Sequence, residues 1–331
     1  MDHSLRKEFF IELEKEIKLL INKNTGELDS KYSRVINCPV CSASEDGNEF
    51  LFKKNGFTFV RCNDCGMMFT NPQVKTEILE ELYENSKSNE LWVELQRSKK
   101  EHAWKKDYYL DSIDLINKHI DDKSIRLLDV GCNNGYFLEV ARENTKWKLK
   151  GIDLNEKALK LAQDKGLNVE KTLLSLLNDS EQYNLFTLHG VLEHIPEPKK
   201  ILNDIKIKTA KNSTSYSLMI VPNAYSLYHM FLQEKSPSFD GRDHLIYFSE
   251  DTLRKLFELN GFEVVSLDTV LTGISALKRQ AQWFDPNGDV NTEKYLSKKI
   301  KNICNGKEIE DFIYKNNLGL RLRILAKYTK E

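Results

Sequence analysis

Long apolar runs are missing from this 331-residue chain, and no segment of about 18 apolar residues is available to span a membrane. An excess of one charge is also missing. The 49 Lys and Arg residues balance 50 Asp and Glu, and a net charge of −1 gives no overall field to attract nucleic acid. The N-terminal segment carries charges where a secretory signal would be apolar. We therefore expect a cytoplasmic protein with neither a membrane span nor a nucleic-acid partner.

Cysteine is scarce but clustered. Four of the six cysteines form two C-x-x-C pairs with 20 residues between them: Cys38, Cys41, Cys62 and Cys65. Without a secretion signal, this spacing indicates a metal site and not disulfides. Asn55-Gly56 lies between alternating apolar runs and predicts a β-hairpin that connects the pairs. We predict a zinc ribbon over residues 31–72, and its Zn²⁺ is structural because four sulfur ligands leave no position for a substrate.

Two roles for the ribbon stay open at this point. It could contact nucleic acid, or it could be a scaffold that shapes a small-molecule site. Its only basic side chains within residues 36–72 are Lys53, Lys54 and Arg61. Three positive charges are few for binding a phosphate backbone, so the composition favours the scaffold.

The rest of the chain changes pattern twice. Residues 1–30 read as an N-terminal amphipathic helix, and residues 73–121 as a helical linker. Residues 122–331 alternate between short apolar strands and amphipathic helices, which predicts a doubly wound α/β domain. Helix N-caps and terminal glycines support this interpretation: Asn155, Gly166, Ser249 and Gly261.

The segment DVGCNNG follows the first strand of that domain. It lacks the G-x-G-x-x-G of dinucleotide folds and the P-loop lysine, so phosphate binding is not favoured. Gly131 and Gly135 frame the turn, and Asn133 tolerates the left-handed backbone that it needs. Asp129 would repel a phosphate but accept from a cationic amino group, and Asp153 ends the next strand, where a carboxylate binds a ribose. The two acids predict a ligand that has a ribose and a positive charge but no phosphate. S-adenosylmethionine is such a ligand.

Three segments carry a family resemblance. LLDVGCNNGYFL, LKGIDLN and LFTLHGVLEHIPEP together resemble class I, Rossmann-like methyltransferases that depend on S-adenosyl-L-methionine, over about 125–270 plus the last strand. The resemblance implies a mostly parallel seven-stranded sheet whose last strand, in LRLRILAKYTK, is antiparallel. A helical insertion at about 271–316 would then cover the substrate or form dimer contacts, so an oligomer is one expectation.

The resemblance also implies which residues surround the cofactor. Asn133 replaces the usual middle glycine of the family, and Asp179 is the one candidate for the acid that meets the adenine. The residues expected at the methionine, ribose and sulfonium parts are Asp129, Gly131, Asn133, Gly135, Asp153, Leu154, Leu188 and His189.

Two features restrict the range of possible methyl acceptors: the segment GRDHLIYFSEDTL and the ribbon. Both are similar to zinc-containing small-molecule methyltransferases, including sugar C-methyltransferases that act on nucleotide-linked deoxysugars. In those enzymes a histidine after an acid is the proposed base, which implies His244, with Asp243 before it and Tyr247 nearby. His194 in LEHIP is a second candidate base or a helix cap. A histidine titrates near neutral pH and can accept a proton there.

We therefore expect methyl transfer to a sugar, a nucleotide-linked sugar or a glycan precursor. The sugar C-methyltransferases carry an extra C-terminal domain for which this sequence leaves no room, so O-methylation is expected at least as readily as C-methylation. One alternative is an RNA-modifying methyltransferase that grips RNA with its ribbon. Another is a non-catalytic zinc-ribbon interaction protein, which Asn133 supports and the acids Asp129 and Asp153 oppose.

Overall fold

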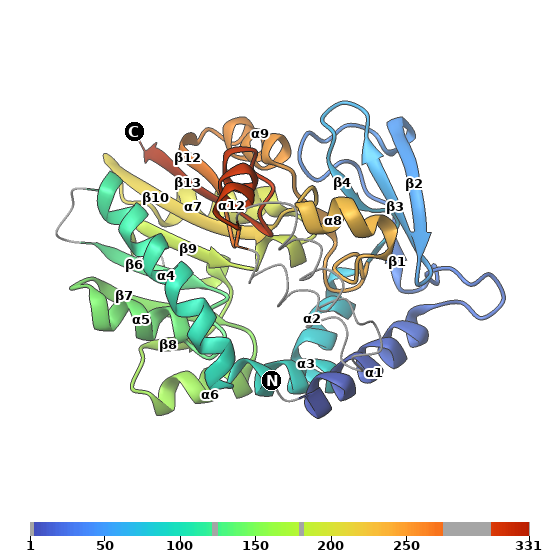
Figure 1. The fold of residues 1–331 in the computed structure, drawn as a ribbon, viewed down its shortest axis with the longest axis horizontal. Coiled ribbons are helices and arrows are strands. Elements are labelled where there is room, and N and C mark those ends of the chain that lie inside the picture. Colours follow the sequence, from blue (N-terminus) through green and yellow to red (C-terminus); the bar gives the residue numbers. More distant parts are fainter. Residues whose placement is uncertain (1–2, 121–124, 179–181, 274–305, 331) are drawn as a thin grey trace.

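The computed structural model describes residues 3–120, 125–178, 182–273 and 306–330 (Figure 1). These residues form a seven-stranded, a four-stranded and a two-stranded sheet. Asp179 and most of the expected insertion at 271–316 lie outside the described residues. No described helix combines the length and the apolarity needed to cross a membrane.

The seven-stranded sheet confirms the predicted fold. Its strand order is β12-β13-β10-β9-β6-β7-β8, and β13 runs antiparallel to both of its neighbours while the strands from β10 to β8 are parallel. The strands are β6 (Arg126–Val130), β7 (Lys148–Asp153), β8 (Val169–Lys171), β9 (Leu185–His189), β10 (Ser213–Pro222), β12 (Glu263–Val270) and β13 (Arg321–Lys330). The carboxyl ends of β6, β7 and β9 therefore share one edge, where ligands bind in open α/β sheets.

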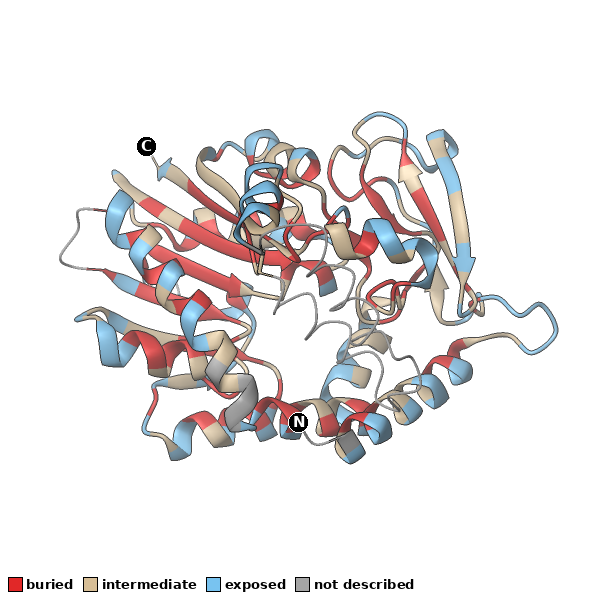
Figure 2. Cartoon of the chain, in the orientation of Figure 1, coloured by how far each residue is buried: buried red, intermediate tan, exposed pale blue. Residues whose placement is uncertain are grey.

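Helices cover both faces of this sheet. Neighbouring residues of β6 show the two-sided burial: Leu127 packs into one hydrophobic core and Leu128 into the other, and both are fully buried. The central strands β6, β9 and β10 are accordingly buried along most of their length (Figure 2). The first core is formed with α4 (Lys99–His119), α5 (Tyr136–Asn144) and α6 (Glu156–Asp164), and the second with α7 (Pro198–Lys208) and α9 (Glu250–Leu259).

The expected helix boundaries are confirmed by hydrogen bonds. Asn155 caps α6, because its side chain accepts from the Ala158 backbone N–H at 2.9 Å. Ser249 forms a capping box with Thr252 at the start of α9. The terminal glycines of the two helices, Gly166 and Gly261, both have positive φ, as a left-handed helix end requires.

The four-stranded sheet is the ribbon, with β2 (Asn48–Lys54), β3 (Phe57–Cys62), β4 (Met68–Thr70) and β11 (Ile246–Tyr247). Asn55 and Gly56 have φ values of 52° and 84°, which confirms the hairpin turn. Strand β11 comes from the α/β part of the chain and pairs with β4, so Ile246 lies opposite Phe69. The ribbon thus shares one of the two cores of the main sheet.

Three N-terminal helices complete the arrangement. Helix α1 (His3–Leu20) covers only the first part of the expected segment 1–30 and packs on α3 (Lys87–Gln96). Figure 1 shows α1, α2 (Thr76–Asn85) and α3 running between the ribbon and the main sheet. The remaining elements are β1 (Ser33–Arg34), β5 (Gln73–Val74), α8 (Leu227–Leu232) and α12 (Gly306–Lys315).

Candidate active site

The turn after β6 has the backbone that its sequence predicts. Gly131 and Gly135 have φ values of +73° and +74°, and Asn133 adopts φ 49°. A Cβ on Gly131 would lie 2.4 Å from Cγ2 of Val191, and one on Gly135 would lie 2.4 Å from Cδ1 of Leu167. Both glycines are therefore required by conformation and by space.

Asp153 organises the other side of this turn. Its Oδ2 accepts from the Asn133 backbone N–H at 2.8 Å, and its Oδ1 accepts from the Asn155 N–H at 2.8 Å. The Tyr83 hydroxyl of α2 also donates to Oδ1, at 3.0 Å. Burial raises the pKa of this carboxyl, against the effect of these donors. Both carboxylate oxygens of Asp153 therefore act as hydrogen-bond acceptors at the end of the strand. One of them, Oδ1, already accepts from the Tyr83 hydroxyl.

Asp129 is buried beneath the turn. Thr187 of β9 donates to its Oδ1 at 2.7 Å. Burial is the main cause that raises the pKa of Asp129 to about 7, and the nearby Asp153 carboxylate adds to the rise. The protonation state of Asp129 therefore depends on pH and on any positive charge that comes near.

The other expected cofactor residues lie around the strand ends. Leu154 is half-buried directly after Asp153, and Leu188 is fully buried in the core. The His189 ring packs against Tyr109 and Phe137, with ring centroids 5.0 and 4.3 Å away. Burial lowers the pKa of His189 to about 3, so its imidazole is neutral at physiological pH.

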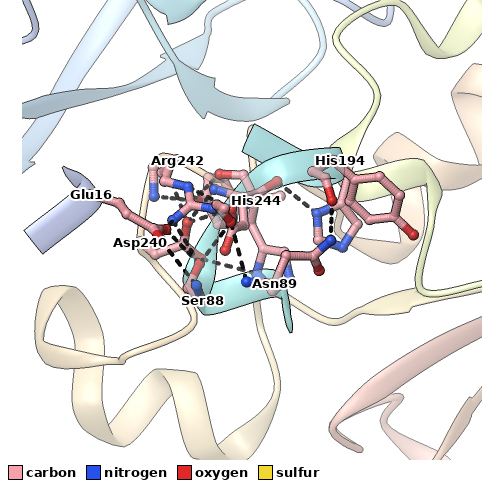
Figure 3. A network of polar contacts seen from close by, with 12 residues as sticks. Glu16, Ser88, Asn89, His194, Asp240, Arg242 and His244 are labelled. Carbon is pink, nitrogen blue, oxygen red and sulfur yellow. Dashed lines mark hydrogen bonds and ion pairs between the residues drawn. The ribbon is translucent and has the colours of Figure 1, made fainter. Parts of the chain in front are cut away.

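The two histidines predicted as bases lie together (Figure 3). The ring centroids of His194 and His244 are 4.9 Å apart. His194 Nδ1 donates to the Asp243 carbonyl at 2.8 Å, and His244 Nδ1 donates to the Ser238 carbonyl at 3.0 Å, because a carbonyl oxygen can only accept. These bonds leave the Nε2 lone pair of each ring available.

The acids around His244 are arranged differently from the sequence expectation. Asp240, and not Asp243, faces the His244 ring, with Oδ2 3.6 Å from Nδ1. Asp243 instead pairs with Arg242, and Tyr247 donates to the His244 carbonyl at 2.5 Å. Asp243 and Tyr247 therefore hold the loop in shape, and their side chains are engaged away from the imidazole.

The four cysteines converge as predicted. Cys38 and Cys65 sulfurs are 3.5 Å apart, those of Cys41 and Cys62 are 3.6 Å apart, and all four lie within 4.8 Å of one another. Four thiolates at about 2.3 Å from a tetrahedral Zn²⁺ would be separated by a little under 4 Å. The donor set and its spacing fit a structural zinc ion.

Comparison with known proteins decides the family. The family described as "Methyltransferase domain" matches residues 102–267, half of the chain. This chain belongs to that family. It is a methyltransferase by family, and the match covers the glycine turn, Asp153 and the histidine loops.

Curated relatives and solved structures resemble this methyltransferase over different lengths. The ubiquinone biosynthesis O-methyltransferase of Bordetella avium is 34% identical over 85 residues, which cover 23% of this chain and 35% of the relative. That of Neisseria meningitidis is 27% identical over 135 residues, covering 35% and 57%. The methyltransferase thus spans less than two thirds of these relatives.

Two solved structures share its fold. Magnesium protoporphyrin IX methyltransferase from Synechocystis, with bound S-adenosylhomocysteine, has a TM-score of 0.50 at 12% identity and covers 78% of this chain and 100% of its own. The plantazolicin methyltransferase, also in complex with S-adenosylhomocysteine, has a TM-score of 0.50 at 13% identity and covers 76% and 94%.

Several site residues of the methyltransferase were not found from its sequence. Tyr83 reaches Asp153 from 70 residues away, and Asp240 faces His244 from a loop without a recognised motif. Glu193 is buried beside both histidines. Only the letters LEHIP, in which Glu193 and His194 are adjacent, gave a signal for this last position.

Proposed function

We propose that this chain transfers a methyl group from S-adenosylmethionine to a polar small molecule. The observation that carries the proposal is the continuity of the site. Val191, in the loop after β9, lies against Gly131 of the cofactor turn, and Glu193 and His194 follow two and three residues later. The turn that would hold the cofactor and the segment that carries His194 therefore follow neighbouring strands, β6 and β9, and the His244 ring lies beside His194.

The residues supply binding and proton transfer, while the activated methyl group comes from the cofactor. Asp153 would accept from the ribose diol, and Asp129 would face the positive charge of the methionine part. An in-line arrangement of acceptor and methyl group can contribute about 7–11 kcal/mol to lowering the barrier in favourable cases. His244 is the candidate base, with His194 beside it, since each has an available Nε2 lone pair.

The acceptor we propose is a sugar or a nucleotide-linked sugar, methylated on oxygen or carbon. The similarity of the segment around His244 to sugar methyltransferases supports a sugar. The names of the curated relatives, which are O-methyltransferases of ubiquinone biosynthesis, support a small molecule and transfer to oxygen.

We also propose that the four cysteines bind one structural Zn²⁺ that supports this site. The ribbon strand β4 pairs with β11, which begins two residues after His244, and the Thr70 N–H donates to the Leu245 carbonyl at 3.0 Å. Leu245 in turn donates from its N–H to the Glu193 carbonyl at 3.0 Å. The ribbon thereby fixes the two loops that carry the histidines.

The contacts of the ribbon weigh against RNA as the acceptor. Arg61 is paired with Glu49 at 2.7 Å, Lys53 is paired with Glu27, and Lys54 donates to the Ser236 carbonyl at 2.6 Å. All three basic side chains within residues 36–72 are engaged within the protein, so few positive charges remain there to bind phosphates.

A turnover assay tests the proposal. The purified chain is incubated with methyl-labelled S-adenosylmethionine and separate panels of nucleotide sugars, catechols and RNA, and S-adenosylhomocysteine formation is measured. We expect release that depends on a small-molecule acceptor and is lost in Asp153→Ala. Release only with RNA would move the assignment to the RNA alternative, and a protein that binds no cofactor would contradict the proposal.

A further inference from the structure

Three potential ligand atoms converge beside the cofactor turn. Glu193 and His194 belong to the 3₁₀ turn Leu192–His194, and His244 lies in the loop before β11. One carboxylate oxygen and one ring nitrogen from each histidine all lie within 4.8 Å of one another. Glu193 Oε1 is 3.9 Å from Nε2 of His194. The ribbon holds both segments in place, so their proximity is built into the fold.

Glu193 is difficult to explain without a ligand. Its side chain is only 3% exposed, and its Oε2 atom has no hydrogen-bond partner among the described residues. A buried carboxylate oxygen that accepts no hydrogen bond is destabilising, because it has lost its contacts with water and gained none in the protein. A cation bound at Glu193 would remove that destabilisation.

The two imidazoles are oriented as metal ligands usually are. Each donates its Nδ1–H to a backbone carbonyl, His194 to Asp243 and His244 to Ser238. A metal-binding histidine almost always donates its second ring nitrogen in this way, which fixes the tautomer and leaves Nε2 for the metal. Asp240 lies on the Nδ1 side of the His244 ring, with Oδ2 3.6 Å from Nδ1, and so also stands away from Nε2.

We propose that Glu193, His194 and His244 bind one divalent transition-metal cation, separate from the cysteine site. Two histidines and one carboxylate suit Mn²⁺, Fe²⁺, Co²⁺ or Zn²⁺. Metal–ligand bonds of about 2.0–2.2 Å require ligand atoms about 3–4 Å apart. Small side-chain rotations would bring the three ligand atoms, now within 4.8 Å of one another, to that separation. His194 and His244 are 43% and 22% exposed, and the cation is therefore open on one side.

This inference rests on the proposed function and specifies its acceptor further. Three protein ligands leave positions for acceptor oxygens, and a molecule with two adjacent oxygens, such as a vicinal diol of a sugar, would occupy two of them. Coordination lowers the pKa of the bound hydroxyl. Its O–H bond breaks and the proton passes to water; the alkoxide oxygen then bonds to the methyl carbon as the S–CH₃ bond breaks, and the electron pair stays on sulfur.

The cation and the simple base are alternative uses of the same lone pairs. If Nε2 of His244 coordinates a metal, it does not accept the acceptor proton. Chelator sensitivity therefore distinguishes them, because a histidine base acts without metal.

The test uses the full chain with its cysteine site saturated with Zn²⁺. Mn²⁺ is titrated calorimetrically, and bound manganese is counted by elemental analysis and electron paramagnetic resonance. We expect one Mn²⁺ site whose affinity falls at least tenfold in Glu193→Gln and in His244→Asn, with zinc content unchanged. His119→Asn, which changes an exposed histidine on α4, is the matched control and should leave Mn²⁺ binding intact.

Binding of S-adenosylhomocysteine is measured on the same samples, and turnover is measured before and after chelation under conditions that retain zinc. We expect chelation to reduce turnover and Mn²⁺ to restore it, while cofactor binding persists. Absence of a Mn²⁺ site, or equal affinity in His244→Asn, would overturn the cation proposal. Full turnover without the metal would overturn it as well and leave the methyltransferase assignment standing, whereas loss of cofactor binding would count against that assignment.

Discussion

Arg242 and Glu16 form a buried ion pair that joins the loop before β11 to helix α1, with Nη1 and Oε2 2.6 Å apart (Figure 3). The side chains are only 3% and 11% exposed. Glu16 also accepts from the Ser88 backbone N–H at 2.9 Å, which ties α1 to α3. Because Arg242 lies two residues before His244, the N-terminal helix supports the loop that carries the candidate base or metal ligand.

Removing Glu16 should therefore affect both stability and activity. In Glu16→Ala, Arg242 remains buried with only part of its charge compensated, which we expect to cost about 3–5 kcal/mol of unfolding free energy. The matched control is Glu14→Ala on the same helix, whose pair with Lys18 is exposed and contributes little. Chemical denaturation and turnover check this, and equal effects of the two substitutions would contradict the buried role of Glu16.

The glycine turn can be tested with two glycines of almost equal φ. Gly131→Ala meets Val191 at 2.4 Å, whereas Gly166 has φ +71° with nothing within 4 Å of an added Cβ. Both alanine variants carry backbone strain of about 1 kcal/mol or more, but only Gly131→Ala should lose S-adenosylhomocysteine binding. Calorimetric titration of both proteins checks this. Similar losses in the two variants would show that strain, and not the shape of the turn, decides binding.

Tyr83 and a ribose would compete for the same oxygen of Asp153. Because the Tyr83 hydroxyl donates to Oδ1 in this structure, Tyr83→Phe removes a bond that the cofactor would have to replace. A net hydrogen bond is worth about 0.5–1.5 kcal/mol, so we expect S-adenosylhomocysteine to bind about two- to tenfold more tightly to the variant. Weaker binding would mean that the hydroxyl contacts the cofactor or orders the site for it.

The raised pKa of Asp129 makes the ligand-free protein sensitive to alkaline pH. Its folded pKa is about 7, against an ordinary value of 3.8, so the folded state binds more protons between these values. Stability from this group is present below pH 3.8 and is lost as pH rises through about 7. Asp129→Asn should therefore be more stable than the natural protein at pH 8, by up to about 4 kcal/mol of unfolding free energy, with a smaller gain at pH 5. Its unfolding temperature should be higher accordingly.

Thermal unfolding across pH checks this, with the unchanged Asp153 contributing to both proteins. A pH-independent difference between the two proteins would contradict the burial argument. The same substitution should weaken cofactor binding at pH 8 if, as we propose, Asp129 faces the positive charge of the methionine part.

The cysteine site should control the histidine loops. Cys62→Ser should lower zinc content and the unfolding temperature, because one of four thiolates is lost, and structural zinc in small folds contributes about 10–16 kcal/mol. Cys132→Ala changes a cysteine outside the cluster and should retain zinc. Elemental analysis with thermal unfolding distinguishes them. Full zinc retention in Cys62→Ser would rule out a four-cysteine site.

Sequence reasoning succeeded where local chemistry determines structure. Asn55-Gly56, the caps Asn155 and Ser249, and the left-handed Asn133 were readable because each depends on neighbours within a few residues. The alternation of strands and helices likewise predicted the doubly wound sheet, and the family resemblance implied its antiparallel last strand.

The remaining contacts depend on segments that are distant in sequence. Glu16 meets Arg242 across 226 residues, and Tyr83 meets Asp153 across 70. Asp240 faces His244 because the loop turns back on itself, so the acid adjacent in sequence, Asp243, was the natural but different choice. No periodicity or motif encodes such pairs, since they are set by packing of whole elements.

The central claim is that the turn from Asp129 to Gly135, with Asp153, binds S-adenosylmethionine. The most direct measurement is calorimetric titration of the zinc-loaded chain with S-adenosylhomocysteine, in parallel with Asp153→Ala. We predict one binding event in the micromolar range for the natural protein and at least a tenfold loss in the variant. A folded, zinc-loaded chain that releases or absorbs no binding heat at several temperatures, and shows no thermal stabilisation by the ligand, would contradict the account.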